Sequence, residues 1–141
     1  MEIIEDYGDY LPRCNVLKVT QSLLTIVPRE QLTGLQSIIL KNSTAGSRKE
    51  RRRVPSERRG AYFRAWQNRA AYIELYVDHI IGDDPVFLSR IPLYCDILLG
   101  DVLFHEIGHH LHAQRYPEYE DREVVAKKWS KKLLGIYLRY I

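Results

Sequence analysis

The chain has 141 residues, of which 45% are hydrophobic and 28% are charged, and its formal net charge is +3. This length and balance suit one globular domain with a sizeable core, so we expect a single domain over residues 1–141. No apolar run approaches the roughly 18 residues that cross a membrane, which argues against a membrane protein.

Residues 1–12 are predicted to be a short acidic tail. The tail lacks the basic and apolar regions of a signal peptide, so we expect a cytoplasmic protein. In that compartment Cys14 and Cys95 are expected to stay reduced, with a disulfide between them as the alternative. Residues 14–27 carry apolar side chains three and four positions apart, which predicts a helix that ends before Pro28.

Residues 35–40 form a short apolar run that we predict to be a strand. Residues 42–59 follow without apolar periodicity and are expected to form a flexible loop. Within this loop, residues 48–59 carry seven basic and two acidic side chains, a local net charge of +5, whereas the rest of the chain sums to −2. The loop could be a solvated insertion, a contact surface for nucleic acid or an acidic partner, or a cleavable segment that covers a cleft.

Residues 60–66 and 71–77 are rich in aromatic and β-branched side chains and flank a polar turn. We expect them to pair as an antiparallel hairpin. With residues 35–40 they would form a small, three-stranded, mostly antiparallel sheet. The predicted fold class is therefore α+β, with an N-terminal helix, this sheet and two C-terminal helices.

The first C-terminal helix is predicted to begin near Pro92, or after Gly100, and to run through His112. Upstream of Phe104 it is apolar nearly all round, as expected for a central buried helix. The second is predicted from about Asp121 to Arg139, with apolar residues on one face and lysines on the other.

The central helix carries the sequence His-Glu-x-x-His at residues 105–109. Residues four apart share a helix face, so His105 and His109 can hold one metal ion between their imidazoles. Glu106 is turned by about 100° and would sit beside that ion, where it can act as general base on a bound water. Zinc is the expected metal because it takes nitrogen and carboxylate ligands and acidifies water.

A catalytic zinc site usually has three protein ligands, so a third is needed. No histidine follows His112, which lies about 10 Å along the helix from His105, too far to share the ion. His110 points away from His105 and is expected at the surface or beside the ligands. Among the acidic residues, Glu123 is favoured because it lies at the rim of the apolar face of the last helix, with Glu120 as the alternative.

The sequence His-Glu-Ile-Gly-His at residues 105–109, followed by Glu-Val-Val-Ala at residues 123–126, resembles the gluzincins. The short chain and the order of its predicted elements resemble the minigluzincins, and the motif is similar to that of the cytosolic metallopeptidases that cleave phage or radiation-response repressors. The resemblance covers residues 60–139 and implies His105, His109 and Glu123 as Zn²⁺ ligands, with Glu106 as general base and acid. The basic loop has no counterpart in the family pattern.

We therefore expect a zinc metalloendopeptidase, active or latent, that hydrolyses peptide bonds of a peptide or protein. Tyr116 and Tyr119 are candidates for stabilising the oxyanion. Residues 71–77 are the expected sheet edge for an extended substrate, with an interior strand as the alternative. The alternative function is a non-catalytic zinc-containing binding module, or a protein that contacts nucleic acid through the basic loop. Retention of Glu106 favours the enzyme, because a structural zinc needs no base.

Overall fold

The computed structural model describes residues 1–43, 57–82 and 85–140. Its elements in chain order are β1 (Glu2–Asp6), α1 (Val16–Leu24), the 3-10 helix η1 (Arg29–Leu32), β2 (Leu35–Lys41), β3 (Gly60–Phe63), β4 (Ala71–Tyr76), α2 (Val77–Ile80), α3 (Val86–Ser89), α4 (Tyr94–Arg115) and α5 (Glu123–Arg139). The predicted α+β class is confirmed. None of the helices in the described ranges is long and apolar enough to cross a membrane. Most of the predicted basic loop, residues 44–56, lies outside the described residues.

The sheet differs from the prediction in both strand number and direction. It has four strands in the order β1-β2-β4-β3. Strand β2 pairs in parallel with β1 and with β4, and only the β3–β4 hairpin is antiparallel, as predicted. The missed strand is β1, which lies in the predicted acidic tail. Because only Ile3 of this edge strand is even half-buried, its side chains gave no apolar pattern, and backbone pairing with β2 defines it.

Strand β4 is interior, so the prediction that residues 71–77 form the sheet edge is wrong and the interior alternative holds. Its alternate side chains Ala71, Ile73 and Leu75 are buried, as expected between two neighbours. The edge on this side of the sheet is β3. The sequence predicted the β3–β4 hairpin, but it did not predict that β2 pairs with β4 rather than with β3.

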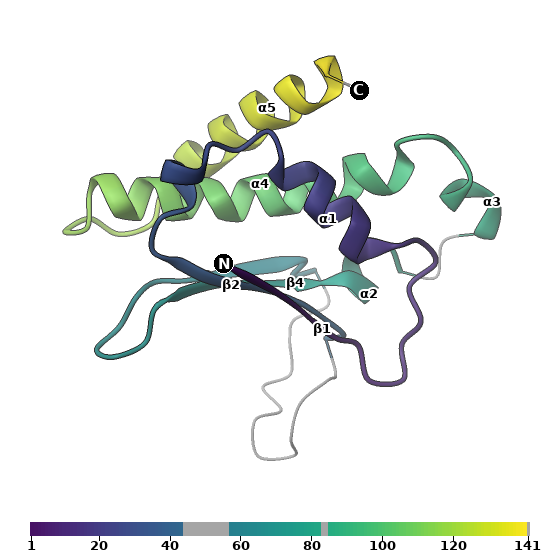
Figure 1. The fold of residues 1–141 in the computed structure, drawn as a ribbon, viewed down its shortest axis with the longest axis horizontal. Coiled ribbons are helices and arrows are strands. Elements are labelled where there is room, and N and C mark those ends of the chain that lie inside the picture. The colour runs from purple at the N-terminus through teal and green to yellow at the C-terminus, as the bar shows by residue number, and fades with distance from the viewer. Residues whose placement is uncertain (44–56, 83–84, 141) are drawn as a thin grey trace.

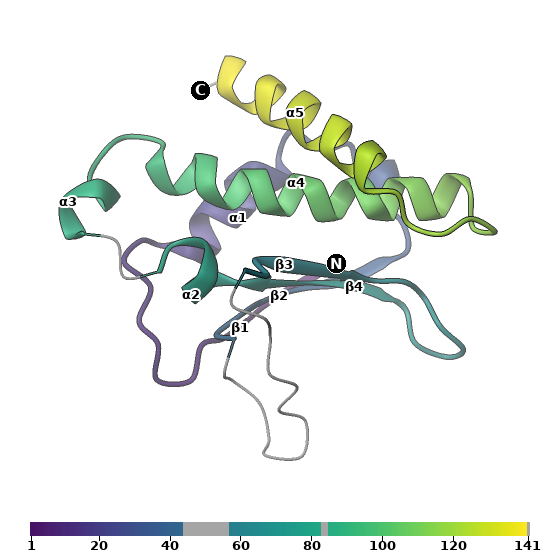
Figure 2. The same cartoon turned by 180° about the vertical axis from the view of Figure 1, so that it is seen from behind.

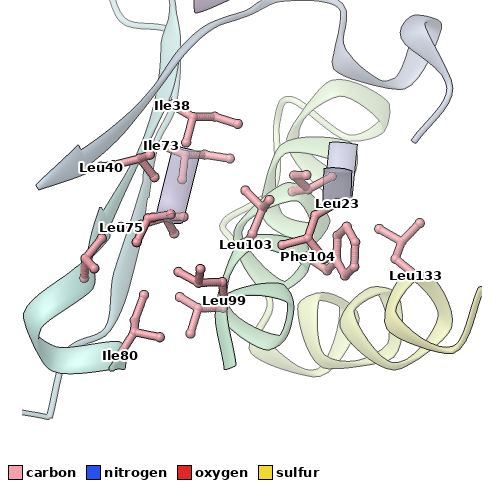
Figure 3. Packing of buried hydrophobic residues seen from close by; sticks show 14 of the residues in the cluster. Leu23, Ile38, Leu40, Ile73, Leu75, Ile80, Leu99, Leu103, Phe104 and Leu133 are labelled. Carbon is pink, nitrogen blue, oxygen red and sulfur yellow. The ribbon is translucent and has the colours of Figure 1, made fainter. Parts of the chain in front are cut away.

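Helices α1, α4 and α5 lie on the same face of the sheet (Figures 1 and 2). Helix α4 lies over the sheet and α5 lies over α4, so α4 is enclosed from both sides. Figure 3 shows Leu99 and Leu103 of α4 turned towards the strands, and Phe104 packed between α1 and α5. All three are fully buried, and each such side chain stabilises the fold by about 1.5–3 kcal/mol through loss of apolar surface. The predicted central buried helix is thus confirmed.

Helix α1 begins at Val16, because the Asn15 side chain caps it by accepting a hydrogen bond from the Lys18 backbone N–H at 3.1 Å. Cys14 therefore precedes the helix rather than starting it. Its thiol meets that of Cys95 in the first turn of α4, and burial together with a hydrogen bond to Cys95 raises the pKa of Cys14 above its usual range. Both cysteines are free thiols.

Candidate metal centre

Two histidines of α4 and the first residue of α5 meet at one point. His105 Nε2 lies 2.9 Å from Glu123 Oε2, and His109 Nε2 lies 2.9 Å from Glu123 Oε1. One ligand atom from each residue lies within 4.8 Å of those of the other two. Ligand atoms around one zinc ion are about 2.0–2.2 Å from it, so a small inward movement would place all three in its shell. The structure brings together the three residues that the sequence indicated as ligands.

Glu123, not Glu120, is the carboxylate in this cluster of described residues. As the first residue of α5, Glu123 lies where backbone N–H groups and the helix dipole stabilise a negative charge. Slight burial acts to raise the pKa of Glu123, but the neighbouring His109 and His105 outweigh it and the net shift is downward. Glu123 is therefore ionised at neutral pH, which is the form that binds a metal.

Gly108, inside the His-Glu-x-x-His sequence, explains how α5 comes so close. A Cβ atom at this position would lie 2.9 Å from the Ala126 Cα, 2.9 Å from the Trp129 Cβ and 3.1 Å from the Ala126 carbonyl oxygen. Two of these contacts are with backbone, which cannot give way as a flexible side chain can. The missing side chain lets the two helices approach at Gly108 and brings Glu123, one turn before Ala126, to the histidines.

The cluster is buried on one side and open on the other. The side chain of His109 is 7% exposed, that of His105 21% and that of Glu123 68%. Burial lowers the pKa of His109, although the negative charge of Glu123 partly opposes this shift. His109 is therefore held in the neutral form that can bind a metal.

Glu106 lies beside the cluster and is only 7% exposed. Burial first, and then the negative charge of Glu123, raises its pKa to about 8, while Arg58 acts in the opposite direction. A divalent cation on the neighbouring histidines would lower this pKa, because positive charge stabilises the carboxylate. Glu106 is thus placed where its protonation would respond to a cation bound by the cluster.

The cluster opens into a cleft of about 720 Å³ that is bounded by β3, α4 and α5. Strand β3 passes close to α4 because it begins with a glycine. A Cβ atom on Gly60 would lie 2.7 Å from the Val102 Cγ1 and 3.3 Å from the Glu106 Cγ. The edge strand of the sheet therefore runs along the wall of the cleft, next to Glu106.

Tyr62, which the sequence did not single out, and His110 contact each other in this region. His110 was expected either at the surface or beside the ligands, and because it is fully buried the surface position is excluded. Its Nε2–H donates to the Thr33 carbonyl at 2.9 Å, and its Nδ1 accepts from the Tyr62 hydroxyl at 2.8 Å. The available signal was the apolar stretch upstream of Phe104, because it indicates a helix enclosed on both sides, and such a helix buries its polar residues as well. His110 thus fixes α4 to β3 and to the segment after η1.

Tyr116 and Tyr119, the expected oxyanion stabilisers, do not line the cleft. Their rings lie 6.1 Å apart, and the Tyr116 ring lies 5.3 Å from that of His112. They pack beyond the C-terminal end of α4. Tyr62 is the tyrosine that does line the cleft.

The donor set fits zinc, which takes imidazole nitrogen and carboxylate oxygen and leaves an open position in catalytic sites. Comparison of the chain with protein-family models, with curated proteins and with solved structures finds no match. The residues of the cluster and their geometry are therefore what indicates a metal centre.

Proposed function

We propose that the protein is a zinc-dependent metallopeptidase of gluzincin type, in which His105, His109 and Glu123 hold Zn²⁺ and Glu106 is the general base. The supporting observation is the convergence of two imidazoles and one carboxylate beside a buried glutamate, in a cleft open to solvent. Structural zinc sites are usually closed by four protein ligands, whereas three ligands beside a cleft suit a catalytic site.

Zinc bound here would polarise the carbonyl of the scissile bond and make a water molecule acidic. Glu106 accepts a proton from the attacking water and donates it to the departing amine. Its surroundings suit both steps, because burial favours the protonated form and a nearby cation favours the ionised form. Burying a carboxylate costs stability, and this cost is expected where the group has a chemical role.

Strand β3 supports a peptide as the substrate. It pairs with β4 on one side only, so the described part of the sheet leaves its other edge open along the cleft. An extended peptide can add to such an edge through backbone hydrogen bonds. A non-catalytic zinc module and a nucleic-acid-binding protein remain the alternatives. The nucleic-acid alternative depends on the basic loop. Its residues Arg51, Arg52 and Arg53 lie outside the described residues.

The test is proteolysis of a denatured general protein substrate by the zinc-loaded chain, compared with Glu106→Gln. The variant should lose about 10²–10⁴-fold of the rate, the usual contribution of general acid–base catalysis, and keep its zinc. Zinc bound at one equivalent by both forms, with cleavage by neither, would refute the proposal. Repeating the assay with residues 44–56 deleted separates a latent form from one that lacks activity.

A further inference from the structure

Two lysines of α5, C-terminal to Glu123, line the cleft. Lys127 and Lys131 come four and eight residues after Glu123, so they share nearly the same helix face at about 6 and 12 Å along the axis. Both line the cleft together with His105 and Glu106. A molecule bound at the metal and extending along α5 therefore passes two ammonium groups.

Two of the acidic groups that line the cleft are already paired with arginines. Asp101 lies 3.3 Å from Arg59. Asp121 lies 3.4 Å from Arg64. Lys127 and Lys131, in contrast, make no ion pair with a described residue. Their ammonium groups can therefore pair with an anionic group of a ligand in the cleft.

The opposite wall of the cleft adds a third cation. Arg58, just before β3, lines the same space as the lysines. Cationic side chains thus lie on both walls of the cleft, where they can contact an anionic group of a molecule bound beside the proposed metal ligands.

We propose that Lys127 and Lys131, with Arg58 opposite, form a subsite that binds a carboxylate group of the substrate. This inference rests on the proposed peptidase function and names its substrate class. An extended peptide advances about 3.3 Å per residue, so a carboxylate two residues from the scissile bond reaches Lys127 and one about four residues away reaches Lys131. Aspartate, glutamate and a free C-terminus all supply this group.

Binding to the zinc-loaded full chain carrying Glu106→Gln tests the subsite without consuming the ligand. Three fluorescent peptides are compared by anisotropy: an amidated peptide with an internal glutamate, its glutamine counterpart, and the glutamine peptide with a free C-terminus. We expect a carboxylate peptide to bind about five- to tenfold more tightly than the amidated glutamine peptide at low salt, since exposed ion pairs are individually weak. If the glutamate peptide binds more tightly, the subsite takes a side-chain carboxylate. If the peptide with a free C-terminus binds more tightly, the subsite takes the terminal carboxylate.

The chain offers a matched control in the neighbouring lysines of the same helix. Lys127→Ala with Lys131→Ala should abolish the preference for a carboxylate. Lys128→Ala with Lys132→Ala changes the net charge equally but removes lysines that do not line the cleft, and should retain it. Equal affinity for all three peptides, equal losses in the two double variants, or tighter binding of a single-stranded oligonucleotide would overturn the proposal.

Cleavage of the same peptides by the unmodified zinc-loaded chain separates this inference from the function on which it rests. Carboxylate-dependent binding that needs Lys127 and Lys131, without any cleavage, would leave the subsite standing and refute the peptidase. Cleavage of all three peptides with equal kcat/KM and equal affinity would retain the peptidase and refute the subsite.

Discussion

Helices α4 and α5 both supply residues of the proposed metal centre, but the fold holds the two helices differently. Helix α4 runs between the sheet and α5, and 12 of its 22 residues are buried, whereas α5 buries only 4 of 17 along one face. Substitutions on α4 therefore act on the fold and on the site together. Substitutions on the open face of α5 act on the site alone. The following expectations test this division, in order of decreasing effect on metal affinity.

Replacing the buried ligand should have the largest effect. We expect His109→Ala to weaken zinc binding by more than about 100-fold, because loss of a mere supporting contact to a ligand already costs about 10–100-fold. Competition with a chromophoric chelator measures the affinity. His112→Ala is the matched control, since His112 is buried on the same helix but lies outside the cluster. Wild-type zinc affinity in His109→Ala would show that His109 is not a ligand.

The exposed ligand on α5 should matter less. We expect Glu123→Gln to reduce zinc affinity about 10–100-fold, because water can replace a ligand that already faces solvent. The free energy of unfolding of the metal-free chain should change little, as expected for a surface substitution. Glu120→Gln is the control, and an equal loss of affinity in that variant would return the third-ligand role to Glu120.

Displacing α5 as a whole should give a mixed effect. Gly108→Ala puts a Cβ atom against the Ala126 backbone, so α5 must move away and carry Glu123 with it. We expect zinc affinity to fall about tenfold and the free energy of unfolding by about 1–2 kcal/mol, since overpacking outweighs the gain in helix propensity. Gly135→Ala on α5 meets no atom within 4 Å and should be neutral or stabilising. Unchanged zinc affinity in Gly108→Ala would show that the close approach is not what positions Glu123.

Removing the Tyr62 hydroxyl should affect the fold but not the metal. Tyr62→Phe leaves the buried Nδ1 of His110 without its donor, which costs about 1–3 kcal/mol. Urea denaturation of the metal-free chain measures this loss, and zinc affinity should stay within about twofold of wild type because the hydroxyl is not a ligand. A large fall in affinity would instead connect Tyr62 to the metal centre.

Features of the site that depend on the residue pattern of a single helix could be predicted from the sequence. The four-residue spacing fixes His105 and His109 on one face, and the apolar face of the last helix favoured Glu123 over Glu120. Features that depend on contacts between distant segments could not be predicted in this way. Strand β1 forms by backbone pairing with β2, β4 becomes interior only when β2 adds beside it, and His110 is buried because two layers enclose α4. The ion pair between Asp101 of α4 and Arg59, just before β3, likewise depends on the folded arrangement.

The gradient of exposure from His109 to Glu123 has a kinetic consequence for the bound ion. A metal enclosed by buried ligands leaves only when the surrounding fold opens, whereas here one of the three ligands faces solvent. An incoming chelator can take the place of Glu123 while both histidines still hold the ion, forming a transient complex in which the metal is shared. We therefore expect the rate of zinc release to rise with chelator concentration, and the metal to exchange without unfolding of α4.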